Sequence, residues 1–197
     1  MTLHVMAEKV AFFLVRKEIV NKEKAEIYSF GFEIMFAALI NGILVIAAAL
    51  IMGVLGQTVL MLVPFMLIRT NAGGFHAQTH AGCVFGFLSV YIITILAVKS
   101  LSAETARTAG AIGLLAAAAL VMKIGALPHK NRPVSGSELT HFKGKTRLIC
   151  LLLSTTGLVG LYFMPSWFIY FALGLSIAAG SLLAGCIQVG YEGRCKK

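Results

Sequence analysis

A histidine and a cysteine, two residue types that can do nucleophilic chemistry, lie close together in an otherwise apolar chain. His76 and Cys83 are seven residues apart in the polar segment 69–83, which also contains Arg69 and the pair Gly73 and Gly74. A cysteine attacks as its thiolate, and a nearby imidazole is the usual group that takes its proton. The pattern predicts Cys83 as a catalytic nucleophile with His76 as its general base and acid.

The spacing of these two residues places a condition on the chain between them. On a continuous helix they would share one face but lie roughly 10 Å apart along the axis. Proton transfer needs a heavy-atom distance of about 2.6–3.2 Å, directly or through one water. We therefore expect a bend, which Gly82 can supply, while Gly73 and Gly74 free the chain before His76 because glycine adopts backbone angles closed to other residues.

The group that orients His76 is left open by the sequence. The chain contains no Asp, so this group must be a Glu, an amide, a hydroxyl or a backbone carbonyl. Four side chains qualify: Glu33, Asn71, Gln78 and Ser89. Arg69 also has two interpretations, because its guanidinium can bind a substrate carboxylate or oxyanion, or can anchor a helix end at the membrane interface.

The composition is that of an integral membrane protein. Hydrophobic residues make up 58% of the 197 residues and charged residues 13%, whereas charged residues are about a quarter of a soluble domain. This length accommodates about six spans of roughly 20 residues. The net charge of +9 fits basic cytoplasmic loops against anionic lipid, so we expect the lipid bilayer, and no nucleic acid, as a partner.

The hydropathy pattern predicts an all-α fold with a single membrane domain over residues 1–197. Residues 3–20 form an amphipathic pattern that is typical of an interfacial helix. A tight turn is expected at Gly56 and Gln57, and Pro64 should kink the short span after it, which suggests a re-entrant or broken element. The predicted spans are approximately 33–55, 58–68, 83–98, 106–124, 148–164 and 168–188.

The distribution of Lys and Arg predicts the orientation. With both ends of the chain inside, five of these residues precede Glu33, one is Arg69, six lie from Lys123 to Arg147 and three lie in the tail, which makes 15 of the 17 cytoplasmic. This strong positive-inside bias puts His76 and Cys83 at the cytoplasmic face. The four cysteines show no metal or redox spacing, and no disulfide is expected on that side of the membrane.

The run Arg69-x-x-x-Gly73-Gly74-x-His76, followed by Cys83 at the head of an apolar segment, resembles the accessory gene regulator B family of membrane peptidases. The length, the basic amphipathic start and the hydropathy profile extend the resemblance over essentially the whole chain. It implies a multi-pass protein of the bacterial cell membrane, a cysteine endopeptidase that cleaves a small quorum-sensing propeptide and helps to close its thiolactone ring. A homodimer would fit the family.

In that interpretation the acyl group of the propeptide passes to Cys83 as a thioester, and a cysteine of the substrate then displaces the enzyme thiol. His76 moves the protons, and no cofactor is expected. We expect the substrate-binding residues to be Arg69, Asn71, Gly73, Gly74 and Gln78.

Two other functions remain compatible with the same segment. His76, His80 and Cys83 stand at positions i, i+4 and i+7, so a helix would bring them to one face in a zinc-like pattern of a metal-dependent hydrolase, although no fourth ligand is evident. Polar, glycine-broken segments between spans also occur in transporters of small molecules or peptides. The lack of repeat symmetry and the scarcity of charges within the spans disfavour a transporter.

Overall fold

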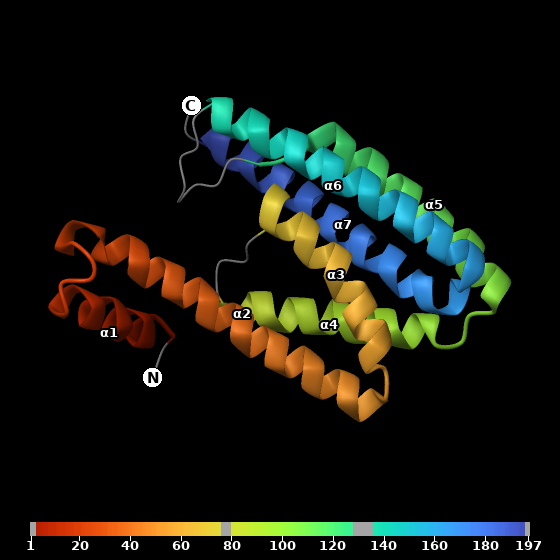
Figure 1. The fold of residues 1–197 in the computed structure, drawn as a ribbon, viewed down its shortest axis with the longest axis horizontal. Helices are drawn as coiled ribbons and strands as arrows, with labels where there is room; N and C mark the ends of the chain where they lie inside the picture. Colours follow the sequence, from red (N-terminus) through yellow and green to blue (C-terminus); the bar gives the residue numbers. More distant parts are fainter. Residues whose placement is uncertain (1–2, 76–79, 128–135, 196–197) are drawn as a thin grey trace. The chain divides into compact units, whose positions relative to one another are not determined.

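A computed structural model describes residues 3–75, 80–127 and 136–195, and nearly all of them are helical (Figure 1). Long apolar sequences form helices because a helix satisfies every backbone group internally, as a lipid environment requires. The elements are α1 (Leu3–Arg16), the 3-10 helix η1 (Lys22–Lys24), α2 (Ala25–Met52), α3 (Leu55–Ala72), α4 (His80–Val98), α5 (Ala103–Ile124), α6 (Gly136–Phe163) and α7 (Pro165–Cys195).

Five stretches of the described chain are long and apolar enough to cross a membrane, namely Lys22–Met52, Leu55–Ala72, Ala103–Ile124, Leu139–Phe163 and Pro165–Gln188. The apolar part of α4, Gly82–Val98, is a shorter helix that coincides with the remaining predicted span. The all-α, polytopic fold class is thereby confirmed. The predicted interfacial helix corresponds to α1, which ends at Arg16, before the expected residue 20.

The predicted tight turn at Gly56 and Gln57 was wrong in position. The turn lies at Gly53, whose left-handed φ of 67° lets its N–H reach the carbonyls of Ala49 and Leu50 and end α2. Helix α3 begins at Leu55, so Gly56 and Gln57 lie inside it. The expected short span 58–68 is part of an 18-residue helix that continues through Pro64, because the packing of neighbouring helices tolerates the lost backbone bond.

The chain divides into two compact units, which we describe separately. The first comprises Met1–Gly53 and Gln78–Val90, and the second comprises Val54–Ala77 and Tyr91–Lys197. In the first unit, α1 packs beside α2 (Figure 1), and the imidazole Nδ1 of His4 lies 3.2 Å from the Glu33 carboxylate. Helix α4 begins in the first unit and ends in the second.

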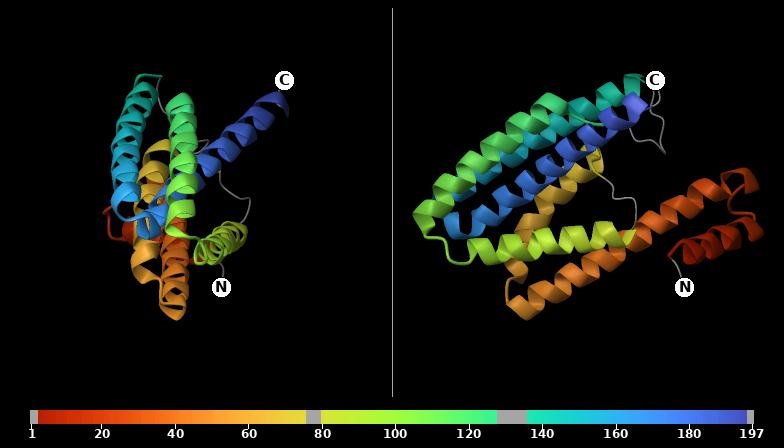
Figure 2. Two further views of the ribbon diagram at one scale, coloured as in Figure 1. Left: turned by 90° about the vertical axis from the view of Figure 1, so that its right-hand side faces the viewer. Right: turned by 180° about the vertical axis from the view of Figure 1, so that it is seen from behind.

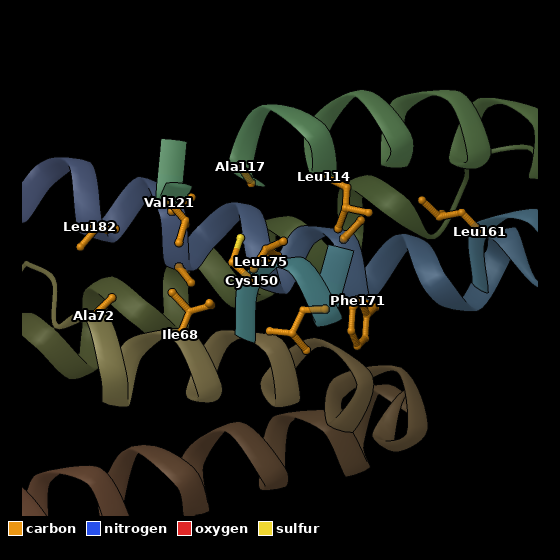
Figure 3. Close-up of a cluster of buried hydrophobic side chains, with 14 residues drawn as sticks. Ile68, Ala72, Leu114, Ala117, Val121, Cys150, Leu161, Phe171, Leu175 and Leu182 are labelled. Carbon is orange, nitrogen blue, oxygen red and sulfur yellow. The ribbon is translucent and has the colours of Figure 1, made fainter. Parts of the chain in front are cut away.

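In the second unit, α7 packs against α3, α5 and α6 (Figure 2). Apolar side chains from all four helices meet in one buried cluster, which is the core of this unit. Figure 3 shows members of this cluster gathered around α7: Ile68 and Ala72 from α3, Leu114 and Val121 from α5, Cys150 from α6, and Leu175 and Leu182 from α7. The core therefore fixes the C-terminal end of α3, where the polar segment begins.

Candidate active site

The polar segment begins where α3 ends. Helix α3 stops at Ala72, and the N–H of Gly73 donates to the Arg69 carbonyl at 3.1 Å. Gly73 and Gly74 have φ angles of 76° and 150°, a region that L side chains rarely adopt. The backbone angles at positions 73 and 74 thus require glycine, as the sequence predicted. We call residues 73–75 the glycine segment.

Arg69 and Ser181 hold the last residue of the glycine segment, Phe75, by both of its peptide groups. The guanidinium of Arg69 donates through Nη2 to the Phe75 carbonyl at 2.5 Å and through Nη1 to the Ser181 hydroxyl on α7. The N–H of Phe75 donates to the Ser181 carbonyl at 2.8 Å. Bonds from a charged donor are stronger than neutral ones, so this arrangement ties the chain firmly to α7.

The glycine segment lies so close to α7 that side chains would not fit. A Cβ at Gly74 would collide with the Arg69 guanidinium and the Ser181 hydroxyl. A Cβ at Gly185, on α7, would lie 2.7 Å from the Gly74 carbonyl carbon and 2.9 Å from the Phe75 nitrogen, closer than Cβ atoms come to backbone. A further bond of 2.9 Å joins the Leu127 N–H to the Ala72 carbonyl.

Asn71 uses its amide within the last turns of α3. Its Nδ2 donates to the Leu67 carbonyl at 2.8 Å and lies 3.3 Å from the Thr70 hydroxyl. These contacts occupy amide hydrogens and leave the Oδ1 atom as the acceptor that could meet a substrate N–H.

Cys83 is the fourth residue of α4, and its side chain is exposed. Since α4 is already helical at His80, Gly82 lies within the helix, and the expectation that Gly82 supplies a bend was wrong. The other described cysteines differ in setting: Cys150 is buried next to Ser154, whereas Cys186 is an exposed thiol on α7. All three described cysteines are free thiols.

Several predicted site residues lie outside what the structure describes. His76 and Gln78 belong to residues 76–79, and His80 begins α4 but has no described side chain. Among the side chains that are described, no three His, Cys, Asp or Glu residues come together as metal ligands. This leaves the set of His76, His80 and Cys83 untested.

Two further candidates for orienting His76 are Glu33, on α2, and Ser89, on α4. Glu33 accepts from His4, whose pKa is raised above its ordinary 6.5 by the hydrogen bond to Glu33, then by the charges of Glu8 and Glu33, against the lowering effect of desolvation. Ser89 lies on α4, six residues after Cys83, and is exposed.

Ser181 and Gly185 were missed by the sequence reasoning. A signal for them existed, because Gly174, Ala178, Ser181 and Gly185 repeat small residues at spacings of four, three and four along the last predicted span. Such a stripe marks one helix face that a neighbouring backbone can approach closely. Which backbone approaches it is information that only the tertiary structure carries.

A family model described as "Accessory gene regulator B" matches residues 7–189, which is nearly the whole chain and includes every candidate site residue. Among curated proteins and solved structures there is no significant match.

Proposed function

Since the chain belongs to the accessory gene regulator B family, whose members process quorum-sensing propeptides, we propose that it is a membrane cysteine endopeptidase with Cys83 as the nucleophile. The observation that carries this proposal is the exposed thiol of Cys83, in the first turn of a helix within the matched range. The proposed substrate is a small propeptide, processed at the cytoplasmic face of a bacterial cell membrane.

In the first step the thiolate of Cys83 forms a bond to the carbonyl carbon of the scissile peptide, and the C–N bond breaks. His76 first takes the thiol proton and then delivers it to the leaving amine, so the protons balance. The N-terminal turn of a helix carries backbone N–H groups without intrahelical partners, which suit the negative oxygen of the tetrahedral intermediate.

In the second step a cysteine thiolate of the bound substrate attacks the acyl-enzyme thioester. One C–S bond forms as another breaks, so the exchange is nearly balanced in energy and produces a thiolactone. Exclusion of water matters more here than driving force, because hydrolysis would release a linear peptide. A site at the membrane boundary favours that exclusion.

The substrate-binding side of the proposed site comprises Arg69, Asn71, Gly73, Gly74 and Gln78. Support for this part comes from the positive φ angles of Gly73 and Gly74, because a backbone without side chains gives a peptide close access to main-chain groups. The contacts of Arg69 with Ser181 and Phe75 favour an indirect role in substrate binding, in which Arg69 holds the glycine segment in place.

The decisive experiment compares two exposed thiols. Purified protein is incubated with the propeptide encoded beside it, and cleavage is followed by mass spectrometry. Cys83→Ala should lower cleavage at least 1,000-fold, whereas the matched control Cys186→Ala should keep it. A propeptide whose ring-forming cysteine is replaced by alanine should leave an acyl adduct on Cys83. Undiminished cleavage by Cys83→Ala would refute the proposal.

A second experiment separates the dyad from a metal site. A zinc site would need His80 about as much as His76 and would fail when a chelator removes the ion. For a Cys–His dyad we expect His80→Ala to keep most activity and chelators to leave the purified enzyme active. Loss of cleavage on chelation, restored by added zinc, would favour the metal-dependent hydrolase.

A further inference from the structure

Helix α7 contributes two residues to the site that its sequence alone did not assign. We propose that Ser181 and Gly185 are positioning residues for the reaction, because together with Arg69 they hold the glycine segment and so set the course of the chain into His76. This inference rests on the proposed function and names a further part of the same site.

The hydrogen bonds give the first argument. Ser181 accepts twice, at its hydroxyl from Arg69 and at its carbonyl from the Phe75 N–H. The Phe75 carbonyl, held by Arg69, belongs to the planar peptide unit that continues into residue 76. Fixing that carbonyl therefore fixes the plane from which the chain proceeds to His76.

The glycine packing gives a second, independent argument. Gly185 faces the Gly74–Phe75 peptide with no room for a methyl group, so its lack of a side chain sets how closely α7 approaches the segment. Gly180, on the same helix, has nothing within 4 Å of the position of an added Cβ. Gly185 and Gly180 thus form a matched pair in one helix, because Gly185 meets the glycine segment and Gly180 does not.

The placement also explains why the segment needs a helix far away in sequence. A mispositioning of about 1 Å can lower a catalytic rate about 100-fold. A three-residue segment with two glycines has little stiffness of its own, because glycine has the largest conformational freedom. Contacts from Arg69, Ser181 and Gly185 supply the stiffness.

The test uses full-length protein in membranes and two matched pairs of variants. Gly185→Ala should lower cleavage of the propeptide about 100-fold and Ser181→Ala about 10-fold. Gly180→Ala and Ser176→Ala should stay within about 2-fold of the parent, since the Ser176 hydroxyl donates to the Ala172 carbonyl of its own helix. Ser181→Thr, which keeps the acceptor oxygen, should recover most of the activity. If Gly185→Ala fails to accumulate, Ser181→Ala carries the test, because it adds no atom.

A second readout separates positioning from general damage. The rate of alkylation of Cys83 by iodoacetamide is measured against pH in a chain lacking Cys150, Cys186 and Cys195. Gly185→Ala and Ser181→Ala should shift this profile toward that of His76→Ala, whereas Gly180→Ala should not.

The outcomes distinguish the two proposals. Parent-like cleavage in Gly185→Ala and Ser181→Ala, or reduced cleavage with a parent-like alkylation profile, would overturn the positioning role while leaving the peptidase intact. Full cleavage by Cys83→Ala would instead overturn the proposed function itself.

Discussion

The three arginines with described contacts in the second unit all donate to backbone carbonyls near helix ends. Arg69 binds the Phe75 carbonyl, Arg147 binds the Met122 carbonyl at 3.0 Å, and Arg107 reaches the Leu161 and Tyr162 carbonyls at 3.4 Å each. Helix ends leave carbonyls without intrahelical donors and carry partial negative charge, so a cation there satisfies both needs. Arg69 is distinguished from the others by holding a non-helical segment that precedes a proposed catalytic residue.

The buried pair Thr58 and Tyr91 makes an asymmetric prediction about stability. Their hydroxyls are 2.6 Å apart, and Thr58 also donates to the Val54 carbonyl at 2.8 Å. After Tyr91→Phe, the Thr58 hydroxyl still bonds to the Val54 carbonyl. We therefore expect the free energy of unfolding to fall by only about 0.6 kcal/mol, which is typical of hydrogen bonds between membrane helices. Thr58→Val removes the hydroxyl that bonds to the buried Tyr91 hydroxyl. The loss of this partner should lower the free energy of unfolding by about 1–3 kcal/mol.

Thermal unfolding in detergent, followed by circular dichroism, measures this difference. Thr155→Val is the control, because Thr155 is exposed and its hydroxyl donates to carbonyls of its own helix. Equal losses for Tyr91→Phe and Thr58→Val would contradict the asymmetry.

The contact of His4 with Glu33 predicts that the packing of α1 on α2 depends on pH. Its pKa is raised from 6.5, chiefly by the hydrogen bond to Glu33. A raised folded-state pKa means that the contribution is fully present below 6.5 and is lost as the pH rises through the folded value. We expect α1 amides to lose protection as the pH rises above 6.5, relative to His4→Gln at each pH, in hydrogen-exchange mass spectrometry. If the ratio of α1 amide protection between the parent and His4→Gln stayed constant with pH, the ion pair of His4 and Glu33 would not hold α1.

Helix α7 owes its place against α3 to its small residues. Gly174 meets the Met61 carbonyl directly, and a Cβ there would also lie 2.9 Å from the Pro64 ring. Small residues on one helix face let two backbones approach, which is how membrane helices gain packing energy. Gly185 extends the same face to the glycine segment, so a single helix face packs against both α3 and the glycine segment.

Gly174→Ala should therefore destabilise the second unit by about 1–3 kcal/mol through overpacking. Gly180→Ala on the same helix, where space is open, should be neutral or slightly stabilising. The measurement is unfolding of the purified protein by increasing dodecyl sulfate in mixed micelles. Equal stability of the two variants would mean that α3 and α7 adjust without strain.

Helices α5 and α6 run in opposite directions, so the start of α5 lies beside the end of α6 in the second unit. Arg107, near the start of α5, binds carbonyls at the end of α6, while Arg147, in α6, binds a carbonyl at the end of α5, so the helices are antiparallel. The 22 residues of α5 extend roughly 33 Å, enough to cross the hydrocarbon core. This pairing also gives Arg107 a structural role at the end of α6. In the predicted orientation, Arg107 is one of the two basic residues on the non-cytoplasmic side.

Single cysteines at Ser100 and His141, in a chain otherwise without cysteine, test this topology. Both positions are exposed, and Ser100 leaves intact Ser102, which caps α5 by accepting from the Thr105 N–H. An impermeant thiol reagent added to intact cells should label the cysteine at 100 and not the one at 141, unless the cells are opened. Labelling of both from outside would refute the predicted orientation.

The sequence by itself determined the class of the molecule and its candidate chemistry. Apolar stretches of about 20 residues dictate membrane helices because backbone groups in lipid must bond internally. The segment around Arg69, Gly73, Gly74, His76 and Cys83 could be singled out because polar residues between apolar spans are costly. These are local properties of composition and spacing, and they need no knowledge of neighbours in space.

The tertiary structure alone decided where the helices break and what holds the glycine segment. Gly53 rather than Gly56 ends α2, because both glycines permit a turn but only one occupies a left-handed conformation, and Gly56 lies against Trp167. Likewise, nothing local to Ser181 and Gly185 marks them as partners of Arg69, 112 residues away from Ser181 in the chain. Contacts between distant segments depend on how α3 and α7 pack, and that packing follows from the shape of both helices together.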